Sequence, residues 1–246
     1  MYITPASTKN PSLVLFLIDV SASIMAELSP DFRRIDAISH LIKKSAVKMI
    51  QRSTKGALVS PRYHVAMFAY SSQVFDLLDG IKPIDELARL GIPQLTPLDM
   101  TNTARAFSLV KETLATEIAK YADCPAPIIL HITDGEFNNG DDPTPIIEDI
   151  RNMSVKDGNV LLANVYIGHP PKKDVFFNVT NADWVDADEK KWCNMASTFP
   201  DAYRAVYREF GFHVPVGAKM YLRGYNPEAF ELLLPMSAAT PVTSNP

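Results

Sequence analysis

The stretch LVLFLIDVSASIM, residues 13–25, decides how the rest of this sequence is interpreted. Its first six residues form an unbroken apolar run, which is typical of a parallel strand that helices cover on both faces. Asp19, Ser21 and Ser23 follow this run directly. The stretch therefore predicts a buried strand whose carboxyl end carries three oxygen-bearing side chains.

The length and composition of the chain predict a large globular domain. Of its 246 residues, 47% are hydrophobic and 21% are charged, which is enough apolar material for a sizeable core. The net charge of −4 and the lack of a Lys/Arg block argue against a general nucleic-acid or membrane-surface binder. No apolar stretch approaches the roughly 20 residues of a membrane span, and the N-terminus lacks the basic region of a secretory signal. We therefore expect a cytoplasmic protein in which Cys124 and Cys193 are buried thiols, with a single disulfide between them as the alternative.

Apolar strands alternate with amphipathic helices along the chain. Strands are expected at 13–18, 63–70, 74–78, 127–133, 160–167, 192–196 and 219–222. Helices are expected at 35–49, 85–90, 102–121, from 143 or 144 onward, at 200–210 and at 227–234. This alternation predicts a doubly wound α/β fold: a mostly parallel sheet with helices on both faces and one antiparallel strand, from the hairpin of 63–70 and 74–78.

Three polar clusters fall at the carboxyl edge of this predicted sheet, where ligands of open parallel sheets bind. They are DVSAS at 19–23, TNT at 101–103 and DGE at 134–136. The clusters offer oxygen ligands and neither sulfur nor imidazole. Oxygen ligands that include two carboxylates suit Mg²⁺ or Mn²⁺ better than zinc or copper.

The order of these elements resembles a known family. D-x-S-x-S after an apolar strand, T-N-T opening a helix and T-D-G ending a later strand are similar to the three loops of the von Willebrand factor A domain. In that family they form the metal-ion-dependent adhesion site. The resemblance covers residues 12–168 well and an extension of the fold at 169–234 more loosely. It implies one domain over 1–234, followed by a tail at 235–246 that we expect to be disordered.

The resemblance also implies a set of metal ligands and a kind of partner. The matching positions are Asp19, Ser21, Ser23, Thr101 and Asp134. Mg²⁺ is the expected ion, with Mn²⁺ or Ca²⁺ as alternatives. The serine hydroxyls would bind it directly, the carboxylates directly or through water, and Thr101 would join or leave with conformation. An Asp or Glu of a protein partner would complete the coordination, so the family implies an interaction module and not an enzyme.

The sequence departs from the family pattern just before Thr101. The family often has a Gly-Gly pair there, whereas this chain has Asp99 and Met100. We therefore expect a different loop geometry, with Asp99 as an additional carboxylate near the site.

The biological setting follows from analogy with the family. The chain resembles stand-alone intracellular bacterial members, which act as adaptors of MoxR-type AAA+ ATPases or of kinases and phosphatases in regulatory or stress systems. The acidic loop 136–142 is interpreted as a turn leading into a helix cap, with a partner-selecting rim as the alternative. Residues 170–246 could add a second contact surface around Trp184 and Trp192.

Two other functions stay open. A metal-dependent phosphohydrolase could use the carboxylates Asp19, Asp134, Glu136, Asp141 and Asp142, but these motifs contain no positive residue and the chain has no G-x-S-x-G or phosphate-binding glycine loop. His131 is interpreted as a core residue and not as a base. An RNA–protein scaffold is the third hypothesis, and the acidic pI of about 5.7 argues against it.

Overall fold

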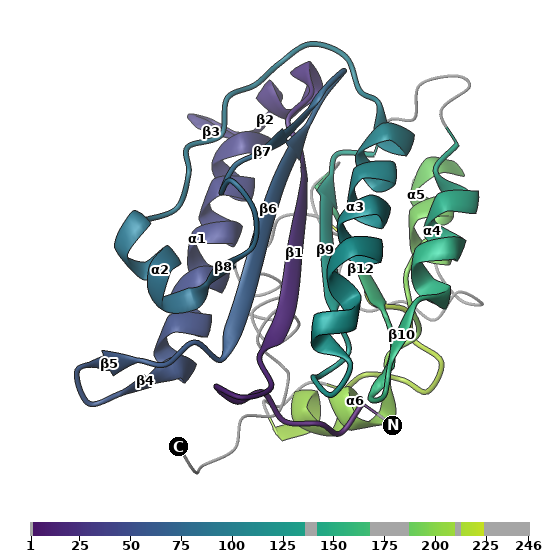
Figure 1. Cartoon of the computed structure of the whole chain (residues 1–246). Helices are drawn as coiled ribbons and strands as arrows, with labels where there is room; N and C mark the ends of the chain where they lie inside the picture. The colour runs from purple at the N-terminus through teal and green to yellow at the C-terminus, as the bar shows by residue number, and fades with distance from the viewer. Residues whose placement is uncertain (1, 136–141, 168–186, 210–212, 224–246) are drawn as a thin grey trace.

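Continuous apolar runs form the centre of a seven-stranded sheet with helices on both faces (Figure 1). The computed structural model describes residues 2–135, 142–167, 187–209 and 213–223. The strand order is β13-β12-β9-β1-β6-β7, and β8 pairs with β6. The strands are β1 (Ser12–Asp19), β6 (Tyr63–Tyr70), β7 (Val74–Asp76), β8 (Lys82–Pro83), β9 (Ile128–Thr133), β12 (Leu161–Tyr166) and β13 (Tyr221–Arg223).

The pairing confirms the predicted fold class. β1, β6, β9, β12 and β13 run parallel, while β7 forms the expected antiparallel hairpin with β6. The short β8 adds a second antiparallel pairing to β6. Since the five parallel strands end on one edge of the sheet, the residues that follow β1 and β9 meet there.

Two hydrophobic cores, one on each face of the sheet, explain why β1 is apolar without interruption. Val14, Phe16 and Ile18 pack into the core beneath helices α1 and α2, whereas Leu15 and Leu17 pack into the core beneath α3, α4 and α5 (Figure 1). The helices are α1 (Arg34–Ser53), α2 (Ile84–Leu90), α3 (Thr103–Glu117), α4 (Thr144–Asn152), α5 (Ala187–Met195) and α6 (Asp201–Glu209). A strand that is covered on both sides cannot alternate apolar and polar residues.

Short elements complete the described part of the chain. Two of them are 3₁₀ turns, η1 (Ala22–Met25) and η2 (Ile118–Tyr121). Six short strands form three small hairpins: β2 (Glu27–Ser29) with β3 (Phe32–Arg33), β4 (Thr54–Lys55) with β5 (Leu58–Val59), and β10 (Ser154–Val155) with β11 (Gly158–Asn159). Among the residues described, no helix combines the length and hydrophobicity that a membrane crossing requires.

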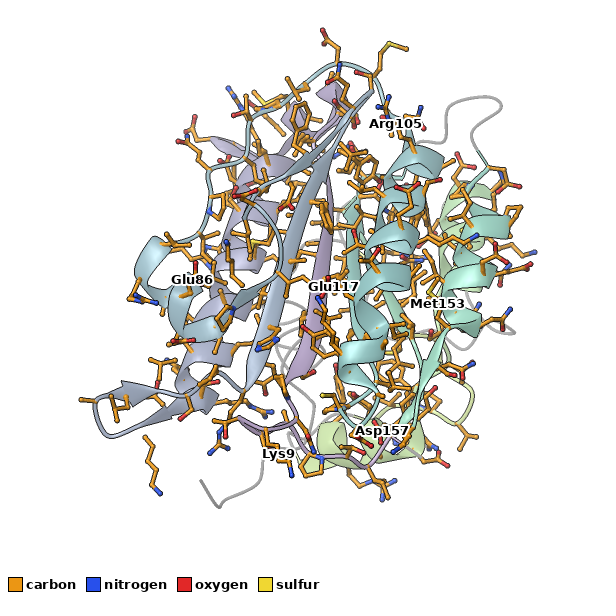
Figure 2. The ribbon with its side chains drawn as sticks, in the orientation of Figure 1. Lys9, Glu86, Arg105, Glu117, Met153 and Asp157 are labelled. Carbon is orange, nitrogen blue, oxygen red and sulfur yellow. The ribbon has the colours of Figure 1, made fainter. Side chains whose placement is uncertain are left out.

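The N-terminal segment is fastened to the turn between β10 and β11. The Asp157 carboxylate accepts hydrogen bonds from the backbone N–H groups of Ile3 and Thr4, both at 2.9 Å, and of Ala126 at 3.1 Å. The Tyr2 backbone N–H donates to the Asp157 carbonyl oxygen at 2.9 Å. Figure 2 shows Asp157 at the lower end of the molecule, opposite Arg105 in the first turn of α3. The group of hydrogen bonds around Asp157, called the Asp157 clasp below, therefore lies at the end of the sheet away from the polar clusters.

One predicted strand is wrong. Residues 192–196 belong largely to helix α5, and Trp192 is fully buried, so it cannot contribute to the predicted second contact surface. The buried residues of this segment recur at helical spacing, a pattern that the strand prediction overlooked; they are Glu189, Trp192, Cys193 and Ala196. Both cysteines are free and buried, which confirms the thiol interpretation. The expected helix at 227–234, the tail, Trp184 and most of the acidic loop lie outside the described residues.

A chain of buried hydrogen bonds runs across the sheet through His131, which is fully buried as predicted. Its Nδ1 lies 3.1 Å from the Asn164 side-chain oxygen, and the Asn164 amide donates to the Trp192 carbonyl oxygen at 2.7 Å. Because that Asn164 oxygen can only accept, His131 Nδ1 carries the proton. Nε2 then accepts from the Tyr70 hydroxyl at 2.8 Å. Burial lowers the pKa of His131 to about 3, so the ring is neutral.

The neutral His131 predicts a pH dependence of stability. Its pKa is about 3 in the folded chain and about 6.5 when exposed, so the unfolded chain binds the additional proton as the pH falls below about 6.5. Comparing His131→Gln with wild type by urea unfolding, we expect the stability difference to shift by about 2 kcal/mol in favour of the variant between pH 7.5 and pH 5. A difference that does not change with pH would contradict a neutral, buried ring.

Candidate metal centre

The carboxylate of Asp19 is fixed at the end of β1. The residue is 1% exposed and lies beside Tyr70 in the parallel register of β1 and β6. Its Oδ1 accepts the backbone N–H of Ser21 at 2.9 Å, and its Oδ2 accepts the hydroxyl of Thr133 at 2.8 Å. These bonds hold the carboxylate in one orientation and tie the end of β1 to the end of β9.

The two serines of the first cluster present their hydroxyls side by side. Ser21 is the N-cap of η1, and its Oγ lies 3.0 Å from the Oγ of Ser23. The buried side chain of Ile24 anchors this 3₁₀ turn in the core beneath α1. The alternate spacing in the sequence therefore brings both hydroxyls to one point.

Asp134 follows β9 and is 4% exposed. Its Oδ2 accepts from Arg34 Nη1 at 2.9 Å. Its Oδ1 is buried and has no hydrogen-bond partner among the described residues. A buried carboxylate oxygen without a partner carries a large desolvation cost, so this atom marks a position where a cation or a donor would bind favourably.

Gly135 makes the turn after Asp134 sterically feasible. Its φ of +100° suits glycine, and a Cβ placed there would lie 1.9 Å from Cε2 of Tyr166. The indole N–H of Trp192 donates to the Gly135 carbonyl oxygen at 3.3 Å. The T-D-G motif thus has a structural cause beside any role in binding.

The segment that contains Thr101 crosses the same edge of the sheet, between α2 and α3 (Figure 1). The backbone N–H of Leu98 donates to the Val20 carbonyl oxygen at 2.7 Å, and that of Asn102 donates to Ser71 at 2.8 Å. Asn102 also caps α3, since its side-chain oxygen accepts the backbone N–H of Arg105 at 3.0 Å. Thr101 is half-buried within this segment.

The two residues before Thr101 stand where the family pattern often has Gly-Gly, and one of them has a positive φ. Met100 has a φ of +64°, a conformation that glycine adopts without steric cost. Its side chain is 70% exposed, and Asp99 is exposed as well. The chain therefore makes a glycine-type turn with a methionine, which places an apolar side chain at the surface beside Thr101.

Negative charge is concentrated at this edge. Burial, and after it the charge of Asp134, raises the pKa of Asp19 to about 6, although hydrogen bonds from Ser21 and Thr133 act in the opposite direction. A buried carboxylate whose charged form is opposed by burial and by a neighbouring carboxylate favours a bound cation. The donor set of carboxylates and hydroxyls fits a hard divalent ion. In the described part of the chain, no three His, Cys, Asp or Glu side chains gather in a way that could hold a metal by themselves.

The structure thus brings four of the five predicted residues into one linked group. Asp19, Ser21 and Ser23 are connected by hydrogen bonds, and Arg34 contacts both Asp134 and the Ser23 carbonyl oxygen, the latter at 3.4 Å. The fifth, Thr101, lies in the segment that is hydrogen-bonded to the same edge.

Three residues outside the predicted ligand set also contribute to the site. Thr133 orients the Asp19 carboxylate through its hydroxyl. Tyr70 lies next to Asp19, and burial, followed by the Asp19 charge, raises the pKa of Tyr70 well above its usual range. Arg34 supplies the positive charge that appeared to be missing from the motifs. Its position at the first residue of a helix that follows the D-x-S-x-S loop was the available signal.

The close approach at Gly135 predicts the effect of adding one methyl group. We expect Gly135→Ala to lower the free energy of unfolding by about 2–4 kcal/mol, because an unfavourable φ adds to a collision with the Tyr166 ring. Gly56→Ala is the matched control: its φ is +64° and nothing lies within 4 Å of the added Cβ. It should cost about 1–2 kcal/mol in urea unfolding. Equal losses for the two variants would contradict the close packing at Gly135.

Comparison with known proteins identifies the fold. No protein-family model matches the sequence, and no curated protein matches it. The structure is similar to a von Willebrand factor type A protein from Catenulispora acidiphila, with a TM-score of 0.55 and 16% identity over 94% of this chain and 42% of that one. It is also similar to proximal thread matrix protein 1 of the mussel byssus with a zinc-occupied MIDAS motif, with a TM-score of 0.54 and 13% identity over 92% and 47%.

A third similar structure matches over nearly its whole length. It is the conserved hypothetical protein BatB from Bacteroides thetaiotaomicron, with a TM-score of 0.52, 15% identity, and coverage of 93% of this chain and 97% of that one. At these identities, the similarity concerns the fold and not the activity. The chain has the fold of the von Willebrand factor A domain.

Proposed function

We propose that this chain is a divalent-metal-dependent protein-interaction module that binds an acidic residue of a partner. The observation that carries the proposal is the buried Asp134 Oδ1, which has no hydrogen-bond partner among the described residues and belongs to a carboxylate close enough to raise the pKa of Asp19. Domains with this fold generally act as interaction modules without catalysis, which supports the same conclusion.

Asp19, Ser21, Ser23, Thr101 and Asp134 would hold the ion. A bound Mg²⁺ would supply a positive centre that accepts an oxygen ligand from a partner. The proposed ligand set contains two carboxylates and three neutral hydroxyls, so part of the ion's charge is left for that ligand. Mn²⁺ or Ca²⁺ would suit the same oxygen donors, and the zinc-occupied site of the mussel protein adds Zn²⁺ to the ions worth testing.

Exposed apolar side chains beside the site support a protein partner. Met25, Leu98 and Met100 are 37%, 36% and 70% exposed. Met25 ends η1, Leu98 is hydrogen-bonded to Val20, and Met100 precedes Thr101. Flexible methionine side chains adapt to partner surfaces of different shape, so these three residues would surround the contacted carboxylate with apolar contacts.

The cellular location and the class of partner are also proposed here. By analogy with stand-alone bacterial members of the family, we propose a cytoplasmic adaptor that serves a MoxR-type AAA+ ATPase, or a kinase or phosphatase, in a regulatory or stress system. The acidic net charge argues against nucleic acid as the partner.

A metal-dependent phosphohydrolase is the second candidate, and one observation favours it. Arg34 lies beside Asp134, so the site does contain the positive side chain that phosphoryl transfer commonly uses. Metal-dependent hydrolysis of a generic phosphate ester by the wild-type chain, lost in Ser21→Ala, would favour this candidate over the interaction module.

Calorimetry on metal-stripped protein tests the proposed function. We expect wild type to bind one Mg²⁺ or Mn²⁺ ion. Ser21→Ala combined with Ser23→Ala should weaken binding at least about tenfold, equivalent to about 1.4 kcal/mol, because it removes two ligands while keeping both carboxylates and Arg34. Ser39→Ala, an exposed serine on α1, is the control and should bind as wild type does. Absence of binding at millimolar metal would contradict the proposal.

A further inference from the structure

Arg34 reaches the candidate metal centre from the start of α1. The β2–β3 hairpin leads the chain back to this point, and the Arg34 backbone N–H donates to the Ala26 carbonyl oxygen at 3.0 Å. From there Nη1 lies 2.9 Å from Asp134 Oδ2 and 3.4 Å from the Ser23 carbonyl oxygen. The guanidinium therefore contacts two of the loops that carry proposed ligands.

This ion pair is shielded from water. The Arg34 side chain is 17% exposed and that of Asp134 is 1% exposed. Charges interact more strongly in such a position than at the surface, and removing one partner of a buried pair leaves an uncompensated charge. Arg34 thus compensates Asp134 when no metal is present.

A divalent ion and this guanidinium would compete for the same carboxylate. The ion needs Asp134 as a ligand, directly or through water, and one of its two oxygens already accepts from Arg34. An ion bound within a few ångströms of the guanidinium would also be repelled by it. Binding of the ion therefore opposes the Arg34–Asp134 contact.

We propose that Arg34 is a tethered competitor that lowers the affinity of the centre for divalent metal and leaves Asp134 when the metal binds. This inference rests on the proposed function, because it concerns the same centre. It makes metal binding a conformational event: the contact between Arg34 and the Ser23 carbonyl is broken together with the ion pair. The free energy of the broken Arg34 contacts is subtracted from the binding free energy of the ion.

Calorimetric titration of Mg²⁺ into metal-stripped Arg34→Gln tests the proposal, with Arg33→Gln as the matched control. Both variants remove one positive charge from adjacent positions, but the Arg33 side chain is exposed, whereas that of Arg34 pairs with Asp134. We expect the Kd of Arg34→Gln to fall at least tenfold and that of Arg33→Gln to stay within twofold of wild type. Arg34→Lys, which keeps the charge, should give a Kd between those of wild type and Arg34→Gln.

Thermal unfolding is a second readout, which measures how much the Arg34–Asp134 ion pair stabilises the chain without metal. In EDTA, Arg34→Gln should melt at a lower temperature than wild type or Arg33→Gln, and saturating Mg²⁺ should raise its melting temperature by more than that of wild type. If wild type binds Mg²⁺ and Arg34→Gln binds it no more tightly, the inference is overturned while the proposed function stands. If only Arg34→Gln binds, Arg34 blocks the wild-type centre: the competition stands, while the proposed metal-dependent function of the wild-type chain fails. If neither binds, both proposals fail.

Discussion

Asp19 and Asp134 place two carboxylates, each almost completely shielded from solvent, at the carboxyl edge of one sheet. Charged groups in such a position are costly unless hydrogen bonds, an opposite charge or a metal compensates them. Here Ser21 and Thr133 donate to one carboxylate and Arg34 pairs with the other. The D-x-S-x-S loop, the T-D-G turn and the first residue of α1 are thus held in place by one requirement, which is to compensate these two charges.

The interior beneath this edge is polar in an unusual way. Tyr70, His131 and Asn164 come from β6, β9 and β12 and form a hydrogen-bonded row that ends at the Trp192 carbonyl oxygen in α5. Each member is buried and has a partner, so the row costs little and specifies one arrangement of the three strands. Because Trp192 also donates to Gly135, α5 is connected both to this row and to the turn after Asp134.

Much of the fold could be predicted from the sequence because apolar runs and helical periodicity report local burial. The run at 13–18, the hairpin after it and the T-D-G strand all occur where expected. The helix at Trp192 was misassigned because it is short, and its buried face includes Glu189, which pairs with the buried Arg223. A charged residue on the inner face of a helix hides the apolar period on which such predictions depend.

The candidate site was predictable to a lesser degree. Ser21, Ser23 and the two aspartates lie in contiguous motifs at strand ends, so strand prediction alone places them together. Arg34 does not belong to such a motif: helical periodicity puts it among the surface cations of α1, and only the path of the β2–β3 hairpin turns it toward Asp134. Pairings of this kind depend on tertiary structure, which a local pattern does not record.

The Asp157 clasp has a practical consequence for how the molecule can be attached to a surface. The N-terminal segment is fastened at the end of the sheet opposite the candidate site (Figure 2). A chain immobilised on a sensor surface through its N-terminus would therefore turn the candidate site toward the solution. Shortening the chain to begin at β1 would instead leave the Asp157 carboxylate without the Ile3 and Thr4 donors, and would loosen the β10–β11 turn that they hold.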